Sequence, residues 1–215
     1  MKELSLFSGA GGGILGSKLA GHTIIGAVEI NEHCQKVLRQ RQDDGVLERF
    51  PIYGDIRAFI RTGRCELFRG LADIISAGFP CQPFSVAGKH LGADDPRNMW
   101  PETIECIRRV RPQYALLENV PGLLAHEYFR TILGELAEAG YDAECDIVSA
   151  CEVGAPHTRE RLFILAYSTS ISGRRECGRL WSAEDRSKER NLYSWENESR
   201  IERMADGVSD RLDRT

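Results

Sequence analysis

Apolar and polar residues alternate between two kinds of segment over about the first 165 residues of the chain. Short apolar runs typical of buried strands occur at 4–7, 23–28, 73–77, 114–117 and 162–166. Segments with the apolar spacing of amphipathic helices lie between them, at 14–19, 31–42, 103–110 and 129–139. Strands that alternate with helices predict an α/β fold with a mostly parallel, doubly wound sheet. Ligands of such sheets bind at the carboxyl ends of the strands.

The pattern changes after Tyr167. Residues 168–215 are polar, rich in Arg, Glu and Ser, and contain few apolar anchors. A short helix is predicted near 199–205 within this tail. We therefore expect a cofactor-binding and catalytic domain over 1–167, followed by a short polar C-terminal tail that is loosely packed or partly disordered.

Composition excludes some classes of protein and leaves the substrate open. The chain has 42% hydrophobic and 28% charged residues, which is ordinary for a soluble globular protein. No apolar run approaches the length of a membrane span and no signal peptide is evident, so we expect a cytoplasmic location. Seven cysteines without a C-x-x-C pair argue against a disulfide framework and a metal site. The net charge of −4 does not exclude a nucleic-acid partner, because binding depends on a local basic face.

A glycine-rich segment, Phe7-Ser8-Gly9-Ala10-Gly11-Gly12-Gly13, directly follows the first apolar run. Glycines allow the backbone to turn tightly and to approach a ligand. Glu29 follows the second run, about 20 residues beyond Gly9, where an acid would meet ribose hydroxyls. Asp55 lies in the turn Gly54-Asp55-Ile56, suited to accept a hydrogen bond from an adenine amino group. The set predicts a pocket for an adenosyl group.

Two cofactors compete for this pocket. NAD would place its pyrophosphate at the helix N-terminus, and residues 11–16 fit the dinucleotide pattern G-x-G-x-x-G. S-adenosylmethionine has no phosphate and carries a sulfonium cation, which suits acidic residues and an aromatic ring such as Phe7. The glycine segment alone leaves both cofactors open.

Cys81 stands between two prolines in the segment 78–85, just after a predicted buried strand. The prolines stop the strand and stiffen the loop that follows it. A single cysteine in a tight turn is usually a packing residue, but Glu118 lies at the carboxyl end of the next strand. A thiol and a carboxyl group in one cleft predict covalent catalysis assisted by an acid. A Cys–His hydrolase is less well supported, because only His157 has a distinctive setting among the histidines.

Arg159 and Arg161 alternate just before the last predicted strand. Alternation in an extended segment places both side chains on one face. Two fixed guanidinium groups would suit a phosphate or a carbonyl oxygen.

In their order along the chain, these motifs resemble those of the DNA (cytosine-5)-methyltransferases, over residues 4 to about 166. Pro80-Cys81-Gln82 resembles the family's nucleophile motif, and Glu118-Asn119-Val120 resembles its Glu-Asn-Val motif. Arg159 and Arg161 resemble the arginines of its Gln-x-Arg-x-Arg motif, with His157 where glutamine is usual. The resemblance implies a Rossmann-like, S-adenosylmethionine-dependent methyltransferase fold with S-adenosylmethionine as the cofactor. The cofactor-binding residues it implies are Phe7, Gly9, Ala10, Gly11, Gly12, Glu29, Ile30, Asp55, Ile56, Pro80 and Trp100.

The resemblance also implies a mechanism and a double-stranded DNA substrate. The target cytosine leaves the helix because its ring is unreachable when stacked. The Cys81 thiolate then adds to ring carbon 6 while Glu118 supplies a proton or hydrogen bond at N3, and carbon 5 takes the methyl group. Arg161 is expected to hold the cytosine carbonyl oxygen, with Arg159 ordering the loop. The DNA-facing residues implied are Gln82, Ser85, Arg97 and Asn119.

The chain departs from the family at its C-terminal end. Members carry a target-recognition region after the Arg-x-Arg strand and a final Gly-Asn segment that packs beside the cofactor loop. Here residues 168–215 are expected to be a reduced target-recognition or linker tail on a truncated core. The expected partners are DNA, a second chain that supplies the missing segment, and a restriction endonuclease, with no membrane. The alternatives are an inactive remnant that binds cofactor or DNA, half of a split enzyme, a compact enzyme of low selectivity, and an NAD-dependent oxidoreductase.

Overall fold

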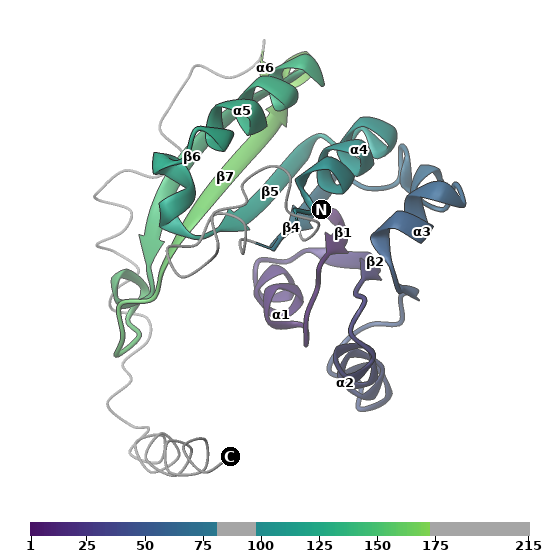
Figure 1. Ribbon diagram of the computed structural model, residues 1–215. Helices are drawn as coiled ribbons and strands as arrows, with labels where there is room; N and C mark the ends of the chain where they lie inside the picture. The colour runs from purple at the N-terminus through teal and green to yellow at the C-terminus, as the bar shows by residue number, and fades with distance from the viewer. Residues whose placement is uncertain (81–97, 173–215) are drawn as a thin grey trace, which may run out of the picture. The chain divides into compact units, whose positions relative to one another are not determined.

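The computed structural model describes residues 1–80 and 98–172, and these residues form a seven-stranded sheet with strand order β3-β2-β1-β4-β5-β7-β6 (Figure 1). The strands are β1 (Lys2–Leu6), β2 (Thr23–Val28), β3 (Ile52–Tyr53), β4 (Ile74–Ala77), β5 (Tyr114–Asn119), β6 (Tyr141–Ser149) and β7 (Glu160–Ser168). β1 pairs in parallel with β2 and β4, and β4 pairs in parallel with β5. The predicted mostly parallel α/β sheet is confirmed. β7 is the exception, because it runs antiparallel to β5.

The helices begin where the sequence supplies capping side chains. They are α1 (Gly12–Leu19), α2 (Glu32–Asp43), α3 (Ile56–Arg61), α4 (Trp100–Val110), α5 (Tyr128–Glu138) and α6 (Thr169–Ser172), with 3-10 turns η1 (Cys65–Phe68), η3 (Pro121–Ala125) and η4 (Ala150–Val153). The Asn31 side chain accepts a hydrogen bond from the Cys34 amide and caps α2. Asp55 caps α3 in the same way, accepting from the Arg57 amide.

Two groups of buried apolar side chains hold the sheet to its helices. The larger group joins β1, β4, β5 and β7 to α4 and α5, with Ile104, Ile107, Ile132 and Leu136 at 2% exposure or less. Figure 1 shows α4 and α5 running beside β5 and β7. The smaller group joins α1 and α2 to β2 through residues such as Ile14 and Leu38. The two groups fix the carboxyl edge of the sheet from both ends of the strand order.

The strand order reverses its direction at β1. The chain moves outward from β1 to β2 and β3, and then returns to place β4 on the other side of β1. The loops that follow β1 and β4 therefore diverge and leave a crevice at the carboxyl edge, which is where α/β sheets of this kind bind ligands.

Val148–Glu160 belongs to a second compact unit, apart from Met1–Ile147 and from β7 beyond its first residue. Most of the predicted tail at 168–215, including the helix predicted near 199–205, lies outside the described residues. No helix within residues 1–80 and 98–172 combines the length and the apolar character that crossing a membrane requires.

Candidate functional site

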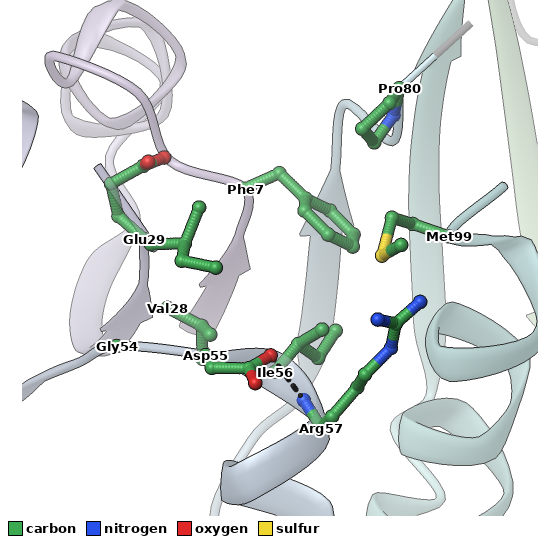
Figure 2. A pocket seen from close by; sticks show the side chains of 10 residues that line it. Phe7, Val28, Glu29, Gly54, Asp55, Ile56, Arg57, Pro80 and Met99 are labelled. Carbon is green, nitrogen blue, oxygen red and sulfur yellow. Dashed lines mark hydrogen bonds between the residues drawn. The ribbon is translucent and has the colours of Figure 1, made fainter. Parts of the chain in front are cut away.

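A pocket of about 330 Å³ lies at the carboxyl ends of β1 and β2, where the crevice is expected (Figure 2). Its lining residues are Phe7, Val28, Glu29, Ile30, Gly54, Asp55, Ile56, Arg57, Pro80 and Met99. Phe7, Glu29, Ile30, Asp55, Ile56 and Pro80 belong to the predicted cofactor set. The volume is at the small end of the range of roughly 300–1,000 Å³ typical of small-molecule sites.

The Glu29 carboxylate ties the glycine turn to the start of α2. Its Oε2 accepts a hydrogen bond from the Gly9 amide at 2.7 Å, and its Oε1 accepts from the Asn31 amide at 2.7 Å. The residue is only 8% exposed, so both bonds are strong charge-assisted contacts. A carboxylate oxygen can accept two hydrogen bonds, so each oxygen keeps capacity for a ligand hydroxyl.

The glycine turn forms the link between β1 and α1 rather than the pocket wall, since Gly9, Ala10, Gly11 and Gly12 do not line the pocket. Gly11 has φ +97°, and a Cβ there would lie 2.8 Å from Leu38 Cδ2. Both the conformation and the space therefore require glycine at this position. The predicted cofactor role of these four residues stays a prediction.

Phe7 takes an unusual backbone conformation at the mouth of the pocket. Its φ is +54°, in the left-handed region that bulky side chains rarely adopt. Figure 2 shows its ring extending across the pocket toward Met99. Strain of this kind is tolerated where it aims a functional side chain, which supports a ligand-binding role for Phe7.

The far side of the pocket is built by the start of α3. Asp55 Oδ1 accepts from the Arg57 amide at 2.9 Å, which holds the carboxylate at the pocket wall. The Arg57 side chain also lines the pocket, and its Nε donates to Glu102 Oε1 at 2.8 Å. The hydrogen bond to Glu102 raises the pKa of Arg57. Sequence reasoning missed Val28, Gly54, Arg57 and Met99, which no motif marked.

Trp100 does not line the pocket, contrary to its predicted place in the cofactor set. It is the first residue of α4 and is fully buried, with its ring centroid 5.5 Å from that of Phe79. Its indole N–H donates to Glu135 on α5. Because α4 begins at this residue, Trp100 turns into the core and Met99 faces the pocket in its place.

Glu118 and Arg161 form an ion pair at the same edge of the sheet. Arg161 Nε lies 2.7 Å from Glu118 Oε1, and the side chains are 24% and 39% exposed. Glu118 is on β5 beside β4, and the chain after β4 leads through Pro80, a pocket residue, to Cys81. Cys81 itself lies outside the described residues, as do Gln82, Ser85 and Arg97.

Two predicted residues have internal partners. Asn119 is 3% exposed; its Nδ2 donates to the Phe79 carbonyl at 3.2 Å, and its Oδ1 accepts from the Val120 amide at 2.9 Å. The Asn119 side chain therefore ties the loop after β4 to the end of β5. Arg159 lies in the second compact unit, where its carbonyl accepts from the Ala150 amide and its own amide contacts His157 Nδ1.

A doubly wound sheet with a pocket at its switch point, two carboxylates in that pocket and an ion pair beside it defines a Rossmann-like enzyme for an adenosyl ligand. The family described as C-5 cytosine-specific DNA methylase matches residues 1–213. The chain belongs to this family, as the sequence motifs predict. Members of the family use S-adenosylmethionine, in agreement with the cofactor implied by the resemblance.

Curated relatives show the same affiliation. The chain is 36% identical to the type II methyltransferase M.AplI of Arthrospira platensis, over 78% of this chain and 46% of that protein. It is 39% identical to M.HpaII of Haemophilus parainfluenzae, over 78% of this chain and 46% of that protein. The chain thus spans about half the length of these relatives.

Solved structures agree with the fold. A mutant of Spodoptera frugiperda DNMT2 superposes with a TM-score of 0.64 at 26% identity, over 82% of this chain and 53% of that one. Dnmt2 of S. pombe has a TM-score of 0.68 at 22% identity, over 92% of this chain and 58% of that one, which shows a shared fold.

Proposed function

We propose that this chain binds S-adenosylmethionine and transfers its methyl group to carbon 5 of cytosine in double-stranded DNA. The observation that carries the proposal is the Glu118–Arg161 ion pair at the strand end that neighbours the loop to Cys81. Pro80, one residue before Cys81, lines the pocket, so the proposed nucleophile and the proposed cofactor site are adjacent in the chain.

The pocket residues suit S-adenosylmethionine. The Phe7 ring and the carboxylates of Glu29 and Asp55 favour a cation, and the sulfonium of this cofactor is one. Glu29 would hold the ribose hydroxyls, and the apolar side chains of Ile56 and Met99 would pack against the adenine ring. When bound, S-adenosylmethionine supplies an electrophilic methyl group. The described residues bring no phosphate-binding arginine or lysine to the glycine turn, which favours it over NAD.

The chain's own residues would activate the base. The Cys81 thiolate forms a bond to carbon 6 of a cytosine flipped out of the duplex, and the electron pair of the 5,6 double bond makes carbon 5 nucleophilic. Glu118 provides a proton or hydrogen bond at N3, which offsets the charge that develops on the ring. After methylation, a base removes the proton of carbon 5, the double bond forms again, and the Cys81 thiolate leaves. Arg161 would hold Glu118 and the cytosine carbonyl oxygen, while Arg159 would order the adjoining loop.

The proposal extends to the DNA and to further partners. Gln82, Ser85 and Arg97 would contact DNA, and Asn119 would contribute by holding the loop that precedes them. We assign catalysis to residues 1–167 and target recognition or linkage to 168–215. Sequence equivalent to the half of the relatives that this chain does not span would be required for selective methylation, in a second chain or in the same polypeptide. A DNA substrate would place the enzyme in the cytoplasm, where a restriction endonuclease is a further possible partner.

Trapping tests the proposal directly. A duplex that carries 5-fluorocytosine cannot lose its carbon 5 substituent, so a productive enzyme stays attached to it. Incubation with S-adenosylmethionine should yield a covalent protein–DNA adduct that maps to Cys81. The Cys81→Ser variant should give none, and Cys34→Ser, on the surface of α2, should behave as the wild type. Folded wild-type protein that binds S-adenosylmethionine but forms no adduct would overturn the catalytic part of the proposal.

A second candidate function is binding without transfer, which the coverage of about half of each relative favours. Calorimetry would then show S-adenosylmethionine binding while no duplex is methylated. Recovery of transfer on adding a polypeptide with the relatives' remaining length would identify a split enzyme instead.

A further inference from the structure

Gly78 follows β4 directly and faces the carboxylate of Glu118. A Cβ placed on Gly78 would lie 2.9 Å from Glu118 Oε2, closer than real Cβ contacts allow. Gly78 is not among the glycines with positive φ, so its backbone conformation does not demand glycine. The space that the Glu118 carboxylate occupies is therefore the physical reason for glycine at this position.

The sheet register explains why these two residues meet. In the parallel pair of β4 and β5, Ala77 lies opposite Leu117, so the next positions outward are Gly78 and Glu118. Residues at equivalent positions of neighbouring strands point to the same face. On the other side of β5, Arg161 reaches Glu118 Oε1 from β7. The carboxylate thus has one oxygen on a guanidinium and the other over a residue without a side chain.

We propose that Gly78 is a positioning residue for Glu118, and this inference rests on the proposed catalytic role of Glu118. A methyl group at position 78 would push the carboxylate away from the end of β4. The end of a glutamate side chain that is 39% exposed can move at little cost to folding. Its new position, however, would be wrong with respect to Arg161 and to a base attacked by Cys81, three residues after Gly78. The substitution is therefore expected to separate catalysis from stability.

Two other glycines provide matched controls. A Cβ on Gly26 would lie 2.7 Å from the buried ring of Phe68 and 3.1 Å from Leu4 Cδ1, so alanine there should disturb the core. Gly134, an exposed residue of α5, has nothing within 4 Å of its Cβ position, so alanine there should be harmless. The three alanine variants make the same chemical change in three different surroundings.

The experiment compares Gly78→Ala, Gly26→Ala and Gly134→Ala in the full chain. Gly78→Ala should match Gly134→Ala in thermal unfolding and in S-adenosylmethionine affinity within about twofold, yet form the fluorocytosine adduct on the order of 100-fold more slowly. In a Glu118→Ala background, adding Gly78→Ala should change the residual rate no further. Loss of stability like that of Gly26→Ala, or an undiminished effect without Glu118, would overturn the proposal.

A second measurement does not depend on activity. In protein labelled with ¹³C at glutamate carboxyl groups, Glu118→Gln identifies the Glu118 resonance. Gly78→Ala should shift that resonance, and Gly134→Ala should leave it in place. If wild-type protein forms no adduct, the proposed function fails while the resonance still tests the positioning role. An unmoved Glu118 resonance in Gly78→Ala would refute that role.

Discussion

Arg161 reaches Glu118 because β7 runs antiparallel to β5, which brings the guanidinium Nε within 2.7 Å of the carboxylate Oε1. A parallel strand would have placed Arg161, the second residue of β7, at the opposite edge of the sheet. The single reversed strand therefore allows a motif that precedes its own strand to join motifs that follow theirs. This is the structural reason why the Arg-x-Arg and Glu-Asn-Val segments share one site.

Replacing Arg161 by lysine should slow adduct formation about tenfold to 100-fold, because an ammonium group cannot reproduce the directed Nε contact with Glu118. The free energy of unfolding should change by less than about 1 kcal/mol, since partly exposed ion pairs contribute little. Arg109→Lys, which alters the surface pairs with Glu66 and Glu105, is the control and should keep the wild-type rate. Equal rates for Arg161→Lys and Arg109→Lys would contradict the role of Arg161.

Replacing Glu29 by glutamine should weaken both the fold and cofactor binding. One of the two backbone donors, Gly9 or Asn31, would then face an amide N–H instead of an oxygen in a nearly buried position. We expect a loss of about 1–3 kcal/mol in the free energy of unfolding, together with a lower affinity for S-adenosylmethionine. Urea unfolding and calorimetry measure the two effects. The exposed Glu48→Gln should change neither, and an intact affinity in Glu29→Gln would show that the ribose is held elsewhere.

A buried polar network at the other end of β1 should be important for stability alone. Glu3 is 1% exposed and bonds to His22 Nδ1 at 2.7 Å, Ser17 Oγ at 2.9 Å and Ser76 Oγ at 2.5 Å. Glu3→Ala would leave these groups without their shared acceptor and should cost about 3–5 kcal/mol in urea unfolding. Glu138→Ala, at the exposed end of α5, is the control and should cost less than about 1 kcal/mol. A small loss in Glu3→Ala would mean that water replaces the carboxylate.

The central elements of the fold could be predicted from the sequence because each carries a strong local pattern. The run at 23–28 matches β2, and the helix predicted at 31–42 differs from α2 by one residue at each end because Asn31 is its cap. β3 was missed, since two residues make no pattern. β6 was missed although Asp142, Glu144 and Asp146 alternate with less polar residues, the signature of an outer strand of a sheet.

The site was predictable where a residue stands at a strand end and less so where tertiary packing decides. Glu29 and Asp55 follow β2 and β3, and both line the pocket. Trp100 was placed in the pocket by resemblance, but the start of α4 turns it into the core. Arg57 and Met99 belong to no motif, and only the packing of α3 near α4 brings them to the pocket. The contact of Gly78 with Glu118 likewise depends on strand register, which one sequence does not reveal.

Tyr141 should make the stability of the fold sensitive to alkaline pH. Its hydroxyl donates to the Pro112 carbonyl at 2.7 Å, and burial raises the pKa of Tyr141 to about 12. An unfolded tyrosine has a pKa of about 10, so between about pH 10 and 12 the unfolded chain loses a proton that the folded chain keeps. The Tyr141 contribution to stability is therefore complete below pH 10 and is lost as the pH rises toward 12, at about 1.4 kcal/mol per pH unit.

Tyr141→Phe tests this reasoning through its pH dependence. The variant lacks the hydrogen bond to Pro112 and should unfold about 1 kcal/mol more easily at pH 8. It also lacks the titrating group, so its free energy of unfolding should fall less steeply above pH 10 and approach the wild-type value near pH 12. Urea unfolding of both proteins at pH 8, 10, 11 and 12 measures the difference. A difference that stays constant over this range would show that the Tyr141 hydroxyl ionises equally in the folded and unfolded chains.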